Sequence, residues 1–527
     1  MFFLKSKWSI FLSVVLLVAT LSGCGGSQQS AEYTLPKGEV SYPIKTDAKL
    51  TYWMPLSPAL GTQVKNYGYT PIAKELEKRT GIRVEYLHPA QGQEKEAINI
   101  LLASDELPDI IQTNWLENDP EKMIRNKIIM KLNDIFTNYA PNMSNWISKN
   151  PDIAKSFKTD EESYYAFPFI RGDQILLTSA GFMVRGDTLK DLGIPYPETI
   201  EEWDIMLAKL KSKYENPVAC NLNQLYFLSS AFGVYQDYYV ENETVKFGPI
   251  QPEFKNLLVK LAEWYKKGYI DPNFATLDAK ISNSNMLDGK SAITWGGGGG
   301  TLGLLINSGI KNNPNYTLEG INYPTHKKGE KPMFGNKQLP YVPFAAAAIT
   351  AKSKAPDVAA RFLDYGYSPE GEMLMNFGIE NESYTMVNGE PTYTKLITEN
   401  PNGLSMAQVM AMHIKASVDG PFVQDKRYIM QYYALPQQKN ALTKWSDVEQ
   451  AKYTLPQTTL NKEEGNKYSQ IMTTITTLKN ETFMNIILGK ASVDSGFEEF
   501  LKKAKDVKID EAIKIQQDAY ARYQKRK

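Results

Sequence analysis

Cysteine and histidine are scarce in this sequence, and their scarcity limits the chemistry that it can support. The 527 residues include 2 cysteines and 3 histidines. The histidines, His88, His326 and His413, show neither the spacing of a zinc ligand set nor a nucleophile motif nearby. A thiolate metal site or a disulfide framework needs more cysteines. We therefore expect no cofactor and no metal centre.

The chain also lacks an excess of charge of either sign. Lys plus Arg number 59, and Asp plus Glu number 59. A protein without a basic surplus has little means of holding a polyanion, so we expect no nucleic-acid partner. With 527 residues, of which 42 % are hydrophobic, the chain is long enough for two or more globular units with large cores.

The first residues carry the pattern of a signal peptide. Lys5 and Lys7 precede an apolar run over residues 8–20, which at about 13 residues is too short to span a bilayer of roughly 30 Å. The run leads into Leu21-Ser22-Gly23-Cys24, which resembles a bacterial lipobox. We expect residues 1–23 to be removed, Cys24 to receive lipid, and residues 24–45 to form a tether.

This lipobox pattern also predicts where the protein works. A chain anchored through Cys24 would lie on the outer face of a bacterial cell membrane. Lys far outnumbers Arg, which favours a Gram-positive source. No later apolar run is long enough to cross a membrane.

From residue 50 onward, short apolar runs alternate with amphipathic stretches. LTYWM, IRVEYL and LPDIIQT are typical of strands, and a helix is expected within EKEAINILLA. Another helix should begin at Thr70 and Pro71 and end at Gly81. This alternation predicts an α/β fold with a mainly parallel sheet, whose ligands bind outside the carboxyl ends of the strands.

Helix signals continue through the rest of the chain. Thr199 and Glu202 form a capping box, and Pro252 begins a helix that should end near Gly268. Further helices are expected at 356–365, 369–377 and from 461 to the end. A helical ending on two α/β segments predicts a two-lobed body whose chain crosses between the lobes more than once.

Several stretches, taken in order, resemble the bacterial extracellular solute-binding lipoproteins of ABC importers. They cover about residues 41–522 and include YPIKTDAKLTYW, DELPDIIQTNW, YYAFPF, GIPYPETIEEWDIML, LDGKSAITW and VAARFLDYGYSPEGEMLMNFGIENESYT. The resemblance is to the large sugar-type branch, family 1, which is LplA/LipO-like. It implies the type II periplasmic-binding-protein fold, with three hinge crossings and a ligand cleft between the lobes.

The resemblance also implies lobe boundaries, by analogy with maltose-type binding proteins. The three crossings are expected near Phe167–Arg171, 294–297 and 365–369. The N-terminal lobe would then comprise residues 46–168 plus 297–366. The C-terminal lobe would comprise residues 170–294 plus 370–527.

One glycine run, AITWGGGGGTLG, contains the spacing of a dinucleotide-binding loop at Gly298, Gly300 and Gly303. A dinucleotide fold needs such a loop in an N-terminal βαβ unit, with an acidic residue about 20 residues further on. The following IKNNPNYTLEGINYPT does not supply that pattern. We interpret the run instead as a hinge and cleft backbone, where conformational freedom and close backbone approach are needed.

A carbohydrate site needs aromatic planes for the apolar faces of sugar rings and polar side chains for the hydroxyl edges. The chain is 11 % aromatic, with 31 Tyr and 8 Trp. Covering about 100 Å² of a sugar face with one Trp is worth roughly 2–3 kcal/mol. Strand ends and family positions select these ligand-binding candidates: Trp53, Asn114, Trp115, Arg171, Gln224, Tyr226, Trp295 and Phe344.

Structural roles compete with these assignments. Trp53 could pack against a helix, Arg171 could form a structural ion pair, and Phe344 could belong to the core. The tripeptide Arg-Gly-Asp, an adhesion motif, occurs at 171–173 and 185–187. An adhesion motif works on a protruding loop, and both copies lie in predicted connections within the lobes, so we assign them no adhesion role.

These observations predict a binding protein rather than an enzyme. We expect a monomer that captures a carbohydrate, in particular an oligosaccharide, by hinge closure and delivers it to the permease subunits of an ABC transporter. No G-x-S-x-G elbow occurs, although 59 acidic residues leave a chance carboxylate pair open. The alternatives are a lipid-anchored glycoside hydrolase and the same fold binding peptides.

Overall fold

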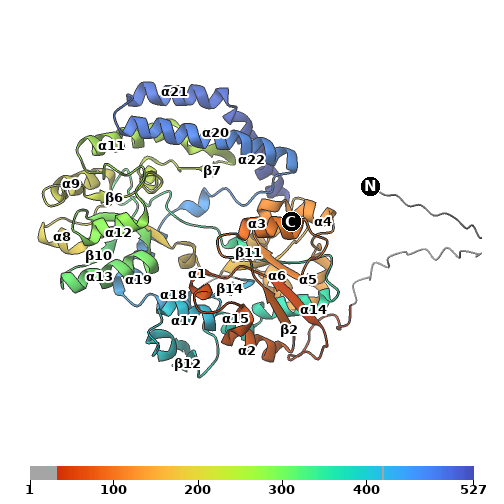
Figure 1. Ribbon diagram of the computed structural model, residues 1–527. Helices are drawn as coiled ribbons and strands as arrows, with labels where there is room; N and C mark the ends of the chain where they lie inside the picture. The colour runs from red at the N-terminus through yellow and green to blue at the C-terminus, as the bar shows by residue number, and fades with distance from the viewer. Residues whose placement is uncertain (1–32, 418–419) are drawn as a thin grey trace, which may run out of the picture.

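Two separate hydrophobic cores organise the computed structural model, which describes residues 33–417 and 420–527. The first core draws mainly on residues 44–170 and 341–433. The second core draws on residues 182–334 and on side chains from 441 to 500. In Figure 1 the elements of the first core lie on the right and those of the second core on the left. The chain is therefore two-lobed, as predicted.

The first lobe is built on a six-stranded sheet with the order β14-β4-β11-β3-β1-β2. Only β11 runs antiparallel to its neighbours, so the other five strands end at the same edge. This confirms the mainly parallel sheet. The strands are β1 (Lys49–Trp53), β2 (Arg83–Leu87), β3 (Ile110–Thr113), β4 (Phe167–Arg171), β11 (Tyr341–Ile349) and β14 (Phe422–Gln424).

Helices surround this sheet, and local sequence signals set their ends. Thr70 accepts a hydrogen bond from the Ala73 amide, and Gly81 ends the helix with φ of 74°. A small hairpin joins β12 (Tyr384–Val387) to β13 (Glu390–Tyr393). The helices are α1 (Pro58–Gly61), α2 (Pro71–Thr80), α3 (Glu94–Leu102), α4 (Pro120–Arg125), α5 (Asn133–Tyr139), α6 (Pro141–Lys149), α7 (Pro151–Ala154), α14 (Pro356–Asp364), α15 (Pro369–Phe377), α16 (Lys395–Thr398), α17 (Met406–His413) and α18 (Lys426–Tyr432).

The second lobe contains a four-stranded sheet with the order β10-β5-β9-β6. These strands are β5 (Ala180–Arg185), β6 (Val218–Ala219), β9 (Ile293–Gly297) and β10 (Leu318–Gly320), and a hairpin joins β7 (Tyr238–Glu241) to β8 (Thr244–Phe247). The predicted capping box of Thr199 and Glu202 is present at the start of α9. The helices are α8 (Gly186–Asp191), α9 (Ile200–Leu210), α10 (Leu222–Leu225), α11 (Pro252–Lys266), α12 (Ala279–Leu287), α13 (Leu304–Asn312), α19 (Pro436–Ser446), α20 (Lys462–Ile487), α21 (Val493–Asp506) and α22 (Ile509–Lys525).

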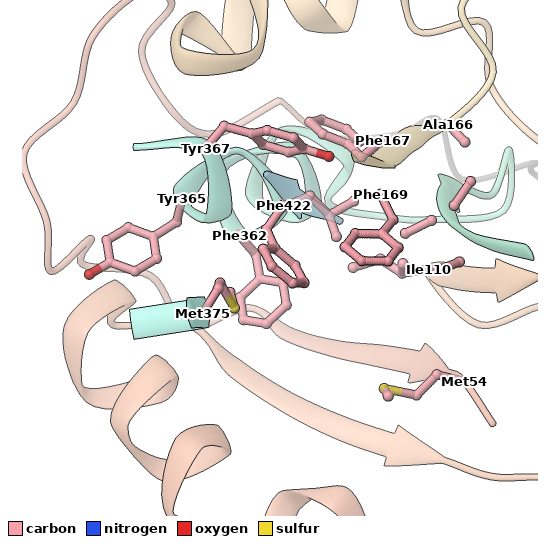
Figure 2. Packing of buried hydrophobic residues seen from close by; sticks show 14 of the residues in the cluster. Met54, Ile110, Ala166, Phe167, Phe169, Phe362, Tyr365, Tyr367, Met375 and Phe422 are labelled. Atoms are coloured by element: carbon pink, nitrogen blue, oxygen red, sulfur yellow. The ribbon is translucent and has the colours of Figure 1, made fainter. Parts of the chain in front are cut away.

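Figure 2 shows how distant parts of the chain share the first core. Phe169 of β4 lies beside Phe422 of β14, with ring centroids 5.1 Å apart. Phe362 of α14 and Met375 of α15 belong to the same cluster. Residues from 374 to 433 therefore pack in the first lobe, although the family analogy placed them in the second.

Two of the predicted crossings differ from the structure. Residues 294–297 belong to β9, in the second sheet, where Trp295 pairs with Phe182 of β5. Residues 365–369 lie inside the first core, because the turn Tyr365–Tyr367 is buried there. The core clusters instead place the crossings at about 171–180, 335–341 and 433–436. Turns and glycine runs show where the chain can bend, but the core in which a segment packs decides to which lobe that segment belongs.

Backbone hydrogen bonds join the first two crossings to each other. The Arg171 amide donates to the Pro340 carbonyl at 2.9 Å, and the Gln338 amide donates to the Leu177 carbonyl at 2.8 Å. Thr178 and Lys337 form an isolated antiparallel bridge beside them. Two segments far apart in sequence thus form one paired connection between the lobes.

The end of α22 binds the first lobe, although α22 packs against α20 and the β7–β8 hairpin of the second. The buried Arg526 guanidinium donates to Asp160 Oδ1 at 2.6 Å and to the Lys155 carbonyl at 3.0 Å. Arg522 Nε donates to the other oxygen of Asp160 at 2.6 Å. This C-terminal contact is a further, non-covalent link between the lobes.

The beginning of the described chain is bound to α14. The Asp357 carboxylate accepts hydrogen bonds from the amides of Thr34 and Leu35 at 2.6 and 2.7 Å. Arg361 donates to the Pro36 carbonyl at 2.7 Å. Residues from Thr34 onward are thus part of the first lobe, whereas the sequence predicted a tether as far as residue 45. Cys24 and the expected signal peptide lie outside the described residues.

Within residues 33–417 and 420–527, no helix combines the length and the apolar character that a membrane crossing requires.

Breaking the C-terminal contact should destabilise the protein. Because Arg526 is buried and binds Asp160, we expect Arg526→Gln to lower the free energy of unfolding by about 2–4 kcal/mol. Arg125→Gln is the matched control, since its ion pair with Glu161 is exposed and should contribute less than about 1 kcal/mol. Urea denaturation of both variants tests this, and equal losses would contradict it.

A buried carboxyl on α14 should make stability depend on pH. Asp364 accepts hydrogen bonds from the Met143 amide and the Asn142 side chain, yet desolvation raises its pKa to about 6. The folded state therefore binds this proton more tightly than the unfolded chain, whose Asp pKa is about 3.9. The contribution of Asp364 to stability must fall as pH rises from about 4 to about 6.

Asp364→Asn removes this titration and leaves the other carboxyls in place. We expect the wild-type advantage over the variant to shrink by about 2–3 kcal/mol between pH 4 and pH 7. Denaturant midpoints measured across this range test the expectation. A wild-type advantage that is constant with pH would show that the pKa is not raised.

Candidate functional site

The edge where the parallel strands of the first lobe end carries polar side chains. Asn114 follows β3 and precedes the short helix Trp115–Asn118. Its amide nitrogen donates to Glu117 Oε1 at 2.8 Å, whereas its buried Oδ1 has no partner within the described residues. A buried acceptor without a donor costs free energy, which a ligand hydroxyl that reached it at this strand edge would recover.

Phe344 is an exposed aromatic residue on the central strand β11. The pairing of β11 with β4 shifts register between Val342 and Ala347, and Phe344 lies within this irregularity. Its side chain is 54 % exposed, although most of the strand is buried. Bulges redirect side chains in this way beside functional sites. Since Ala346 pairs with Thr113, Phe344 lies close to the edge where β3 ends.

The second lobe presents a stacked aromatic pair, formed by the central residue of β9 and a residue of the 3₁₀ helix Tyr226–Phe232. The rings of Trp295 and Phe227 are 4.4 Å apart with planes inclined by 14°, and both residues are half-buried. Phe182 contacts Trp295 edge-on at 4.9 Å. These contacts fix the plane of the indole and leave part of it accessible. A fixed, partly open aromatic plane is suited to the apolar face of a sugar ring.

The glycine run forms a π-helix, Gly298–Gly303, between β9 and α13. Gln438 donates to the Gly298 carbonyl at 2.8 Å, and the Gly298 amide donates to the Ser179 carbonyl at 3.0 Å. A Cβ on Gly298 would lie 2.6 Å from the ring of Tyr433, which belongs to the first core. The sequence predicted that this glycine run forms a hinge between the lobes. In the structure the run lies within the second lobe and contacts the third crossing at Tyr433. Its glycines permit a close approach between the lobes.

Arg171 ends β4 at the first crossing. Its guanidinium donates to the side chain of Gln338 on the second crossing. Desolvation lowers the pKa of Arg171, and Tyr428 is the ionisable group that opposes this. The side chain is half-buried, so it is placed at the junction of the lobes with part of its surface accessible.

Several predicted ligand residues are instead core residues. Trp115 and Tyr226 are 0 % and 1 % exposed, and Trp53 is 7 % exposed. The Tyr226 ring packs against Phe254 and Phe483. Covered side chains have no surface for a ligand, so the structure does not support these three.

Gln224 has a local structural role that the sequence did not reveal. It is half-buried, and its side chain forms a capping box with Asn221 at the start of α10. An amide used in this way has less capacity to bind a ligand. For Asn114, Arg171, Trp295 and Phe344, the structure provides accessible or unpaired groups, and ligand binding by them remains a prediction.

Sequence reasoning missed Phe227, Gln338 and Tyr433. Phe227 follows Tyr226 directly in the 3₁₀ helix Tyr226–Phe232. Phe227 stacks on Trp295, whereas Tyr226 is buried in the core. Neither the residue type nor the spacing distinguishes these neighbours. Gln338 and Tyr433 acquire their positions from crossings that the sequence did not locate.

Within residues 33–417 and 420–527, no group of three or more His, Cys, Asp or Glu residues is arranged to hold a metal ion. Cys220 is a buried free cysteine, and burial raises the pKa of its thiol.

Comparison with known proteins identifies the family. The family of bacterial extracellular solute-binding proteins matches residues 61–373. The chain belongs to this family. The expectation of a binding protein rather than an enzyme is thereby confirmed.

Relatives of known structure confirm the two-lobed fold. The alginate-binding protein AlgQ2 without calcium ion is 22 % identical, with a TM-score of 0.70 over 92 % of this chain and 100 % of its own. An HMO-binding, ABC-transporter-associated solute-binding protein from Bifidobacterium longum infantis is 16 % identical, with a TM-score of 0.72 over 90 % of this chain and 99 % of its own.

A further relative is known by sequence. Lipoprotein LipO of Bacillus subtilis (strain 168) is 22 % identical over 421 residues, which are 75 % of this chain and 76 % of that protein. The resemblance to LipO-like proteins that the sequence suggested is confirmed.

The glycine run offers a matched test of interlobe packing. Gly298→Ala would force its Cβ against the buried ring of Tyr433, so we expect a loss of about 1–3 kcal/mol in the free energy of unfolding. A Cβ on Gly300 would meet no atom within 4 Å, so Gly300→Ala should be neutral or gain up to about 1 kcal/mol from helix propensity. Denaturant unfolding of both variants tests this. Similar stabilities would contradict a tight contact at Gly298.

Proposed function

We propose that this protein captures a carbohydrate, in particular an oligosaccharide, between its two lobes and delivers it to the permease of an ABC importer. The stacked pair of Trp295 and Phe227 is the observation that best supports a sugar ligand. The alginate-binding protein AlgQ2 and the S. pneumoniae substrate-binding protein FusA, whose structure contains kestose, support it as well, since they share the fold.

The groups at the lobe junction suit the two sides of a sugar ring. Trp295 and the exposed Phe344 offer apolar surface to C–H faces. Asn114 Oδ1 offers an unpaired acceptor and Arg171 offers donors to hydroxyl or acidic groups. These groups belong to both lobes, so a ligand that contacts all of them favours the closed form by its differential affinity for the two states.

Membrane attachment through lipid on Cys24 forms part of the proposal. The sequence Leu21-Ser22-Gly23-Cys24 and the lipoprotein LipO support it. The anchored protein would lie on the outer face of the membrane of a Gram-positive bacterium, as a monomer. The loaded, closed form is the one that the permease would recognise, since only that form brings both lobes into a fixed relation.

A ligand screen tests the carbohydrate assignment directly. Residues 25–527 are heated with neutral oligosaccharides, acidic oligosaccharides or peptides, at about a hundredfold excess over the expected Kd. A ligand that binds only the folded state should add about 2.7 kcal/mol of stability. We expect a shift with one class of sugar and recovery of that sugar intact. A shift with peptides alone would overturn the carbohydrate assignment, and cleaved sugar would overturn the role in transport.

Trp295→Ala tests where the sugar binds. We expect at least about tenfold weaker binding, because the stacked plane is lost. Trp146→Ala is the matched control, since Trp146 is a half-buried tryptophan on α6 of the first lobe and should leave affinity unchanged. Calorimetry with the sugar found in the screen measures both. Equal affinities would remove Trp295 from the site.

A further inference from the structure

The same tripeptide, Arg-Gly-Asp, occurs twice and is used in two different ways. At 185–187, Arg185 Nε and Nη2 bind both oxygens of Asp187 at 2.9 and 2.6 Å. At 171–173, Asp173 instead accepts the Ile175 amide at 3.0 Å and pairs with Lys426 at 3.0 Å. The carboxylate that sequence proximity offers to Arg171 is therefore engaged elsewhere.

Arg171 also differs from the other arginines in its surroundings. Most of them form an ion pair with Asp or Glu, namely Arg79, Arg125, Arg185, Arg427, Arg522 and Arg526. Within the described chain Arg83 and Arg361 also lack an ion pair, but Arg83 is exposed to water, and Arg361 is fully buried in the first lobe near Asp364 and Asp357, away from the crossings. Over residues 33–417 and 420–527, no carboxylate forms an ion pair with Arg171. Among the described residues, the one side-chain partner of this half-buried guanidinium is the neutral amide of Gln338.

The position of Arg171 makes this missing charge relevant to ligand binding. Its backbone amide binds the Pro340 carbonyl, and its side chain reaches Gln338, so it lies where the first two crossings meet. A desolvated cation without a counter-ion costs free energy, which an arriving anion can recover. Guanidinium is a planar fork of donors that matches a carboxylate in two parallel hydrogen bonds.

We propose that Arg171 binds the carboxylate of an acidic sugar, so that the carbohydrate carried by this protein contains uronate units. This inference rests on the proposed function and specifies its ligand. One sugar unit would lie with its apolar face on Trp295, while the carboxylate of a unit in the same oligosaccharide provides the counter-ion that Asp173 does not. A neutral sugar of the same shape would leave the Arg171 cation uncompensated.

Matched pairs of ligands test the carboxylate alone. Short oligomers of galacturonate, glucuronate and mannuronate are compared by calorimetry with the same oligomers after reduction of each carboxyl to a hydroxymethyl group. We expect at least one acidic oligomer to bind, and its reduced counterpart to bind about tenfold or more weakly. Binding of reduced oligomers as tightly as acidic ones would overturn the proposal and leave carbohydrate capture intact. If no carbohydrate binds at all, the proposed function fails with it.

Substitutions assign the preference to this residue. Arg171→Gln should remove most of the preference for the acidic oligomer while the reduced oligomer binds as before. Arg171→Lys, which keeps the charge but not the planar fork, should retain part of the preference and serves if the glutamine variant does not fold. Arg83→Gln, on the exposed surface of β2, is the control and should keep the wild-type ratio. A wild-type ratio in both Arg171 variants would show that another group recognises the acid.

Discussion

The pairing of the first two crossings is the constraint on which the arrangement of the lobes depends. Each lobe has its own sheet and core, so nothing within a lobe fixes its partner. The hydrogen bonds from Arg171 to Pro340 and from Gln338 to Leu177 hold two distant segments together at the boundary. Because Arg171 ends β4 at this point, the same pairing that joins the lobes also delivers a cation to the surface between them.

Local structure could be predicted from the sequence where the signal is local. The helix from Thr70 to Gly81 and the capping box at Thr199 can be predicted, because the residues that form each cap are neighbours in the sequence and constitute the motif. Lobe membership could not be predicted in this way. Met375 and Phe422 join the first core through contacts with residues far away in the sequence, and no pattern within their own segments records that.

The candidate site shows the same division. Strand ends selected Trp53, Asn114 and Trp115, since the carboxyl edge of a parallel sheet is a general feature, and the expected crossings selected Arg171 and Trp295. In the structure Trp53 and Trp115 are buried, whereas Asn114, Arg171 and Trp295 keep accessible or unpaired groups. Whether Tyr226 or Phe227 contacts Trp295 depends on the direction in which the 3₁₀ helix presents each side chain. The local sequence pattern does not show that direction. The two Arg-Gly-Asp tripeptides make the point most directly, because identical residues pair with each other in one place and with different partners in the other.

The hydrogen bonds of Arg526 and Arg522 to Asp160 link the lobes in addition to the three covalent crossings. The two lobes are thus linked at four places, so their relative motion is more restricted than the three crossings alone would make it. The first lobe also holds the start of the described chain through Asp357. In a protein tethered at its N-terminus, the first lobe would therefore stay close to the attachment point, and the second lobe would move relative to it.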